Sequence, residues 1–259
     1  ELGQSDSAVE KYERALEHDP ECRPAILSLD RLFETMEKWE ELTDVLRREI
    51  RMAVSDDEMV NLQFRLGQIY EQNMQDMDNA LECYRDILTT VPGHSATLAA
   101  LELLFSEGVK QQEIAEIVEP FYTDHGHWDK LVKILEVQLG FVQDLVDRMA
   151  AIQRIAEIYE NQLEDSIESF RWWGKAYLED PTSELVVEEL ERLAAATDSW
   201  EELVEVYESA AQAKGEEPNL KKMILLRKAR ICEEQTQNHA QWEEALQRVL
   251  EIDEQDPDA

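Results

Sequence analysis

The chain has 259 residues, and its 59 acidic residues outnumber its 25 Lys and Arg residues, so its formal net charge is −34 at pH 7. This charge repels the phosphate backbone of nucleic acids, which disfavours general nucleic-acid binding. The longest nearly apolar run, from Ser95 to Phe105, is too short for a membrane-spanning helix, which needs about 20 residues. Eight glycines and seven prolines are about half of average usage, so we expect long helices joined by short loops.

Apolar residues at helical spacing predict a succession of helices, and no run of alternating polar and apolar residues predicts a strand. Pro20 ends the first predicted helix, because the residue before a proline avoids the helical region. Ser55, followed three residues later by Glu58, is typical of a capped helix start. In chain order, the predicted helices span about residues 5–18, 23–36, 39–50, 55–73 and 77–90, and others begin near residues 128, 144, 165, 183, 200, 218 and 239.

Four prolines lie in register with a small residue twelve positions before them. The pairs are Ala8 and Pro20, Ala80 and Pro92, Ser169 and Pro181, and Ala245 and Pro257. In three of the four cases an aromatic residue lies four positions after the small one, as Tyr12, Tyr84 or Trp173. A pattern that recurs at the interval from Pro20 to Pro92 indicates a solenoid built from stacked helical repeats.

One interval of the repeat is longer than the others. Trp39 follows Pro20 at the same spacing at which Trp200 follows Pro181, whereas Trp128 follows Pro92 at a longer one. The excess is an insertion of roughly 17 residues, which is enough for one helix with its connection, so we expect an extra helix near residues 108–125. Because one added helix changes the parity of an antiparallel array, we also expect a local discontinuity near residues 105–128.

No linker of Ser and Gly and no block of charge divides the pattern, so one continuous domain over residues 1–259 is predicted. Its units span about 1–20, 21–92, 93–181 with the insertion, and 182–257. The chain begins at Glu1 inside a repeat and stops shortly after a closing proline. We therefore expect it to be a fragment of a longer array.

The segment from Leu66 to Pro92 resembles a tetratricopeptide repeat, in which Leu-Gly-x2-Tyr is followed by Ala, an aromatic residue and Pro. The matching residues are Leu66, Gly67, Tyr70, Ala80, Tyr84, Leu88 and Pro92, with one extra residue between the two helices. Similar but weaker patterns cover residues 2–20, 155–181 and 229–257. The resemblance is to long, diverged bacterial-type arrays. It implies an all-α, right-handed solenoid of antiparallel helix pairs, with Tyr70 and Tyr159 buried between paired helices.

The resemblance also implies a binding surface, because the first helix of each pair usually lines the concave groove of such arrays. Carried over to this sequence, the groove residues are Asn61, Phe64, Gln68, Glu71, Gln72, Gln153, Glu157, Glu160, Asn161, Arg230, Glu233 and Glu234. Some family members hold acidic chaperone tails with a clamp of lysine and asparagine, but those places hold Phe, Gln and Glu in this sequence. A basic or amphipathic peptide is therefore the expected ligand, with Phe64 or Leu226 providing apolar contact.

Two tryptophans stand side by side at Trp172 and Trp173. Trp173 takes the aromatic position shared with Tyr84 and is expected in the core. Trp172 lies one helical step of about 100° away. A packing role is favoured for it, but it is also the candidate exposed aromatic anchor for a partner.

The sequence contains no nucleophile motif, no glycine-rich phosphate loop and no metal-ligand spacing. No catalytic, cofactor-binding or metal-binding residue is predicted, and we do not expect an enzyme. His125 and His127 flank Gly126 and indicate a turn rather than a metal site. Three cysteines without a Cys-x-x-Cys motif favour a reducing compartment, so a cytoplasmic location is expected.

These observations predict a non-catalytic scaffold with an acidic surface that binds a protein or peptide, without membrane insertion or direct contact with nucleic acid. Two alternatives remain open at this point. The first is a structural spacer that associates with copies of itself. The second is an RNA-processing scaffold of the half-a-tetratricopeptide type, which shares the helix pairing but which the net charge disfavours as a direct RNA binder.

Overall fold

The computed structural model describes residues 2–214 and 217–256, and these residues form only helices. Fourteen α-helices and one π-helical segment cover this part of the chain, with no strand among the described residues. The predicted all-α fold is therefore confirmed. Pro257, the last proline of the repeat, lies outside the described residues.

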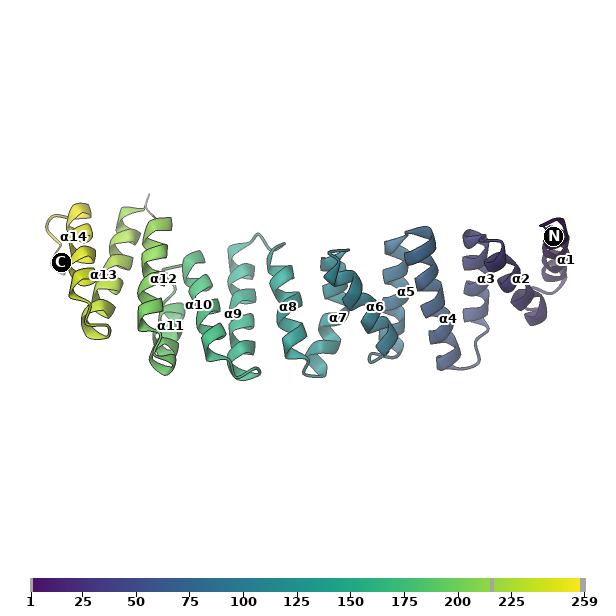
Figure 1. Cartoon of the computed structure of the whole chain (residues 1–259), viewed down its shortest axis with the longest axis horizontal. Helices are drawn as coiled ribbons and strands as arrows, with labels where there is room; N and C mark the ends of the chain where they lie inside the picture. Colours follow the sequence, from purple (N-terminus) through teal and green to yellow (C-terminus); the bar gives the residue numbers. More distant parts are fainter. Residues whose placement is uncertain (1, 215–216, 257–259) are drawn as a thin grey trace. The chain divides into compact units, whose positions relative to one another are not determined.

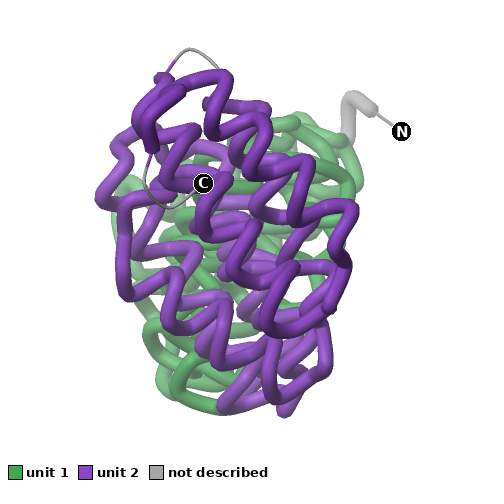
Figure 2. Tube along the Cα trace, turned by 90° about the vertical axis from the view of Figure 1, so that its left-hand side faces the viewer, with its two compact units in different colours: residues 1–125 green, residues 126–259 purple. Residues whose placement is uncertain are grey.

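The chain divides into two compact units, Glu1–His125 and Gly126–Ala259 (Figure 2). The first contains α1 (Leu2–His18), α2 (Arg23–Thr35), α3 (Trp39–Arg51), α4 (Asp56–Gln68), the π-helical segment η1 (Ile69–Met74), α5 (Met77–Thr90), α6 (Ser95–Ser106) and α7 (Gln111–Asp124). The second contains α8 (Trp128–Leu139), α9 (Leu145–Asn161), α10 (Ser166–Glu179), α11 (Glu184–Thr197), α12 (Trp200–Ala213), α13 (Pro218–Glu234) and α14 (His239–Ile252). That the whole chain behaves as one continuous domain stays a prediction.

Within each unit, every helix packs against the next one along the chain (Figure 1). Contacts between alternate helices, α5 with α7 and α10 with α12, add a second direction of packing. No single helix buries its apolar stripe alone, so the core is continuous only because neighbours stack. This is the helical-repeat architecture that the spacing of the prolines predicts.

The extra helix is present as α7. Between α5 and α9 the described chain has three helices, whereas two helices lie between α1 and α4 and two between α10 and α13. The apolar stripe of α7 is covered, since Ile114, Ile117, Val118 and Tyr122 are all buried. The boundary between the two units falls after His125, directly beyond this helix. The expected discontinuity in the stacking stays a prediction.

The turn inside each tetratricopeptide-like pair has the same construction in three places, and it accounts for the extra residue. Five residues after Tyr70, Tyr159 or Cys232, a residue adopts the left-handed conformation, with φ of 55°, 54° or 52° at Gln75, Glu164 and Gln237. The next backbone N–H donates to the carbonyl of that Tyr or Cys at 2.8–3.0 Å. Around Tyr70 the widened turn is the π-helical segment η1.

The residue after this left-handed position caps the second helix of the pair. Asp76 accepts a hydrogen bond from the backbone N–H of Asn79, and Asp165 accepts one from Glu168. Asn238 does the same for Gln241. Asp and Asn are favoured caps because a side-chain oxygen satisfies an N–H that has no partner inside the helix. The spacing Tyr-x5-Asp therefore sets both the width of the turn and the start of the next helix.

The turns before the tryptophans form a second class. Glu37, Gly126 and Asp198 lie two residues before Trp39, Trp128 and Trp200, and have φ of 54°, 69° and 58°. Gly126 thus occupies a position where a left-handed residue is required, which confirms the predicted turn at the histidine pair.

Close packing within the best-matching repeat depends on Gly67. A Cβ atom on this residue would lie 2.7 Å from Cε1 of Tyr84, so the tyrosine ring occupies the space that a larger residue would need. Tyr84 is fully buried and Tyr70 is 4% exposed. Tyr159, at the position equivalent to Tyr70, is only half-buried, so its predicted burial is wrong in degree. Its hydroxyl reaches outward to Glu136 at 3.3 Å, and partial burial raises its pKa to about 12.

Candidate protein-binding surface

The predicted groove residues lie on the first helices of three repeats, α4 with η1, α9 and α13. Five of them belong to the first unit and seven to the second. None of the twelve is buried. Exposed side chains are those of Asn61, Gln72, Glu157, Asn161, Arg230, Glu233 and Glu234, and half-buried ones are those of Phe64, Gln68, Glu71, Gln153 and Glu160. Their role in binding stays a prediction.

In the first unit, the groove positions are partly occupied by contacts within the chain. The Phe64 ring lies 5.8 Å from the ring of Tyr84 and 5.6 Å from that of His94, measured between centroids. Glu71 accepts a hydrogen bond of 2.5 Å from the Tyr84 hydroxyl. Burial and this carboxylate both raise the pKa of Tyr84, so its hydroxyl remains a donor. Phe64 and Glu71 are therefore held in place before any ligand arrives.

In the second unit, ion pairs connect α9, α11 and α13. Glu160 of α9 accepts from Arg192 of α11 at 2.7 Å, and Arg192 also pairs with Glu189 on its own helix. One residue earlier in α11, Glu191 pairs with Arg230 of α13. These long side chains link first helices that follow one another in the array, so two of the predicted groove residues act in the stacking of repeats.

Three other groove carboxylates have no such partner. Glu157, Glu233 and Glu234 are exposed, and no ion pair joins them to a described residue. An exposed carboxylate next to a row of ion pairs contributes little to stability, because water screens it. These three carboxylates are thus available to an incoming cation, whereas Glu160 and Arg230 are already engaged in ion pairs within the chain.

Sequence reasoning missed the residues of α2 and α11 that complete these contacts. Asp30 of α2 pairs with Arg65 of α4, just as Glu191 pairs with Arg230. A signal for them was present, since Leu29 to Leu32 reads Leu-Asp-Arg-Leu and residues 190–193 read Leu-Glu-Arg-Leu. In both half-units, the acidic residue at this position pairs with an arginine of the following repeat.

A more deeply buried charge cluster joins α12, α13 and α14. Lys228 is 3% exposed, and its ammonium group donates to Glu208 at 2.7 Å. Arg248 contacts both oxygens of the same carboxylate at 3.0 and 2.7 Å. Burial alone would raise the pKa of Glu208, but these hydrogen bonds outweigh it and hold the pKa at about 2. The cluster stabilises the packing of three helices, and its charged groups pair with one another.

The prediction that Trp172 could be an exposed aromatic anchor is wrong. Its side chain is 5% exposed, and the ammonium group of Lys175 lies 3.2 Å from the ring centroid. The physical reason is that α10 is surrounded, since it packs against α9, α11 and α12. Trp172 and Trp173 are about 100° apart around α10, and both lie on the part of its circumference that neighbouring helices cover. Both are therefore core residues. The favoured packing role is the one observed.

No group of three or more His, Cys, Asp and Glu side chains is arranged to hold a metal ion in residues 2–214 and 217–256. Within the same residues, no helix is both long and apolar enough to cross a bilayer. The side-chain arrangement there consists of ion pairs, caps and core contacts.

Comparison with known proteins identifies one repeat directly. Residues 62–94 match the family model described as tetratricopeptide repeat. This segment covers the second half of α4, then η1, α5 and the following turn, and it includes the residues on which the sequence pattern is strongest. No curated protein sequence matches the chain significantly.

Several solved structures are similar in helical architecture. The TPR2AB domain of yeast Sti1, solved as a complex with pHSP90, is 15% identical, with 96% of this chain and 92% of that chain covered and a TM-score of 0.31. The C-terminal part of a repeat protein from Cytophaga hutchinsonii is 10% identical, with 98% and 92% covered and a TM-score of 0.28. The tetratricopeptide domain of P58(IPK) is 13% identical, with 99% and 81% covered and a TM-score of 0.28.

Proposed function

We propose that this array of tetratricopeptide-type helical repeats is a non-catalytic scaffold that binds a basic or amphipathic segment of a partner protein along its first helices. The observation that carries the proposal is the set of unpaired carboxylates at Glu157, Glu233 and Glu234 on α9 and α13. They lie at positions that line the groove in the family, on a chain whose net charge is −34. The three free cysteines fit a reducing compartment, and we propose the cytoplasm.

The charge supports a cationic partner for a physical reason. A surface of one sign raises the local concentration of oppositely charged ligands and speeds their association, and salt weakens this effect. The same charge opposes contact between copies of this chain, so self-association is the weaker alternative. It opposes the approach of RNA in the same way.

A direct test uses designed probes in place of an unknown partner. Two labelled amphipathic peptides, one with Leu and Lys and one with Leu and Glu, have about 15 residues each, the length at which an isolated helix begins to be stable. They are titrated with the chain and followed by fluorescence anisotropy. We expect binding of the cationic peptide only. Raising the salt from about 50 mM to about 500 mM should weaken it strongly, because the Debye length falls several-fold.

Variants separate specific binding from general attraction to an acidic protein. The groove variant carries Glu157→Gln, Glu233→Gln and Glu234→Gln. The matched control carries Glu82→Gln, Asp86→Asn and Glu251→Gln, which remove the same charge from exposed positions on the second helices α5 and α14. We expect roughly tenfold weaker binding for the groove variant, from about 0.5 kcal/mol per carboxylate, and less than about twofold for the control. Equal losses in the two variants would contradict the proposed groove.

A further inference from the structure

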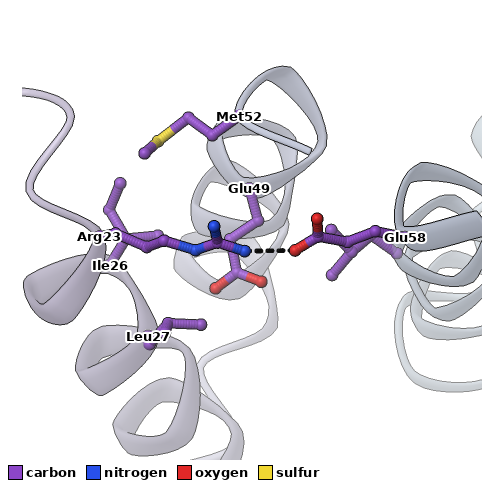
Figure 3. Close-up of a pocket in the computed structure, with 7 residues that line it drawn as sticks. Arg23, Ile26, Leu27, Glu49, Met52 and Glu58 are labelled. Atoms are coloured by element: carbon purple, nitrogen blue, oxygen red, sulfur yellow. Dashed lines mark hydrogen bonds and ion pairs between the residues drawn. The ribbon is translucent and has the colours of Figure 1, made fainter. Parts of the chain in front are cut away.

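A small cavity in the first unit lies between α2, α3 and α4 (Figure 3). Its volume is about 200 Å³, and Ile26, Leu27, Met52 and Leu62 supply its apolar wall. Pockets for drug-sized ligands are roughly 300–1,000 Å³, so this cavity is suited to one side chain rather than to a metabolite. Leu27 is 40% exposed, which places the opening of the cavity at the protein surface.

The carboxylate of Glu49 lies in this cavity without a cation of its own. Its Oε1 atom is buried and has no hydrogen-bond partner among the described residues. The two arginines nearby are already engaged, since Arg23 pairs with Glu58 and Arg65 pairs with Asp30 and Glu34. Figure 3 shows the Glu49 carboxylate beside the Arg23 guanidinium, which is directed toward Glu58. A buried carboxylate oxygen without a donor is costly, so this atom favours a proton, a water molecule or a ligand that donates to it.

The charges around Glu49 do not balance. The charged groups that act on this residue are Asp30 and Arg23 from α2 and Glu58 and Arg65 from α4. Together with Glu49 these are three carboxylates and two guanidinium groups, and Arg65 also pairs with Glu34, so negative charge is in excess around the cavity. An added cation would reduce this excess.

Building on the proposed function, we infer that this cavity accepts a single lysine or arginine side chain of the partner, with its aliphatic stem against Ile26, Met52 and Leu62 and its cationic head on Glu49. Long cationic side chains are suited to such a place because their methylene groups pack on apolar surface while the head keeps a polar contact. The cavity would then act as an anchor for a basic segment of the partner on the first unit.

Binding of a cation here should depend on pH. Burial, followed in effect by the charge of Asp30, raises the pKa of Glu49 to about 7. A cationic ligand stabilises the ionised carboxylate, so it has to displace the proton that Glu49 holds at lower pH. From the ionised fraction of a group with this pKa, the apparent affinity should rise about tenfold between about pH 6 and about pH 8.

The experiment uses n-butylammonium, which has the stem and head of a lysine side chain, and n-butanol as its neutral match. The chain is labelled at its methionine and isoleucine methyl groups, and both probes are titrated by NMR. We expect n-butylammonium to shift the methyl signals of Met52 and Ile26 with the pH dependence given above, and n-butanol to bind at least tenfold more weakly. Equal affinity of the two probes, or affinity independent of pH, would overturn the inference.

Two variants identify the residue responsible. Glu49→Gln removes the cavity carboxylate and should weaken n-butylammonium binding at least tenfold at pH 8. Asp44→Asn removes one charge from an exposed position on the same helix and should leave binding within about twofold of the unmodified chain. Equal binding by Glu49→Gln and the unmodified chain would sink the assignment.

This result is independent of the peptide test. If the cationic peptide distinguishes groove from control variants but n-butylammonium does not bind, the cavity is no anchor and the proposed scaffold stands. If n-butylammonium binds at Glu49 but neither peptide binds, the cavity is a cation site and the proposed scaffold fails.

Discussion

Arg65 of α4 makes a two-pronged contact with Asp30 of α2. Its Nη1 atom donates to Oδ2 of Asp30 at 2.9 Å, and its Nη2 atom lies 2.9 Å from Oδ1. Asp30 is 8% exposed, and the guanidinium contact raises the pKa of Arg65. The pair therefore holds two consecutive first helices at a fixed distance, and the pair of Glu191 with Arg230 does so in the second unit.

Breaking this pair on the arginine side should destabilise the chain. Arg65→Ala leaves the Asp30 carboxylate buried without its cation, and we expect a loss of about 2 kcal/mol in urea unfolding, below the roughly 3–5 kcal/mol of fully buried pairs because Arg65 is partly exposed. Glu34 also contacts Arg65, but its side chain is 57% exposed. Glu34→Ala is thus the matched control, with an expected loss below about 0.5 kcal/mol. Similar losses for the two variants would contradict the assignment.

Gly67→Ala should destabilise the first unit although alanine is the better helix former. The new Cβ atom would meet the Tyr84 ring at 2.7 Å, and both residues are buried. We expect a net loss of about 1–3 kcal/mol from overpacking. Tyr84→Leu removes the ring, so the same Gly67→Ala change made in that background should be neutral or stabilising. A stabilising effect of Gly67→Ala alone, measured by thermal or urea melts, would show that the ring is not confined by this contact.

Tyr70 and Tyr159 occupy equivalent positions but should differ in their contribution to stability. Tyr70→Ala empties a buried site and should cost about 3–5 kcal/mol, by analogy with aromatic truncations in cores. Tyr159 is half-buried, so Tyr159→Ala should cost about half as much. Urea melts of the two variants measure both quantities. A loss below about 1 kcal/mol for Tyr70→Ala would contradict its core position.

The carboxylates of Glu208 and Glu49 should make the stability of the folded chain depend on pH in opposite directions. The pKa of Glu208 is about 2 in the folded chain, below its usual 4.5, so its stabilisation is present above pH 4.5 and is lost as the pH falls toward 2. The pKa of Glu49 is about 7, above 4.5, so its folded state binds the proton more tightly and stability is lost as the pH rises from 4.5 through 7. Each effect should be on the order of 1 kcal/mol, because both groups are partly screened by water.

Melts at about pH 5 and about pH 8 test the second half of this prediction. Glu49→Gln should stabilise the chain relative to the unmodified protein at pH 8 and have little effect at pH 5. Asp44→Asn again serves as the control and should change stability equally at both pH values. A Glu49→Gln effect that does not vary with pH would show that this carboxylate does not titrate in the range inferred.

Much of this architecture could be derived from the order of residues alone, because its contacts are local. A helical repeat stacks each helix on its sequence neighbour, so the spacing of Tyr70, Ala80 and Pro92 already determines which helices pair and where they end. The longer interval before Trp128 likewise predicted the extra helix α7. Such patterns follow from helix periodicity and turn chemistry, which are properties of short stretches of chain.

Contacts between helices that are not sequence neighbours were decided only by tertiary structure. Trp172 is buried on α10, which packs against α12 as well as against its sequence neighbours α9 and α11. The unpaired carboxylate of Glu49 depends on Asp30 and Arg65 pairing with each other across α2 and α4. Sequence spacing gives the face of a helix but not how many neighbours cover it. The free energy of a charged or aromatic side chain depends on that covering, because burial changes its solvation and its available partners. For this reason the repeat could be predicted from the sequence, whereas the candidate cation site required the packed structure.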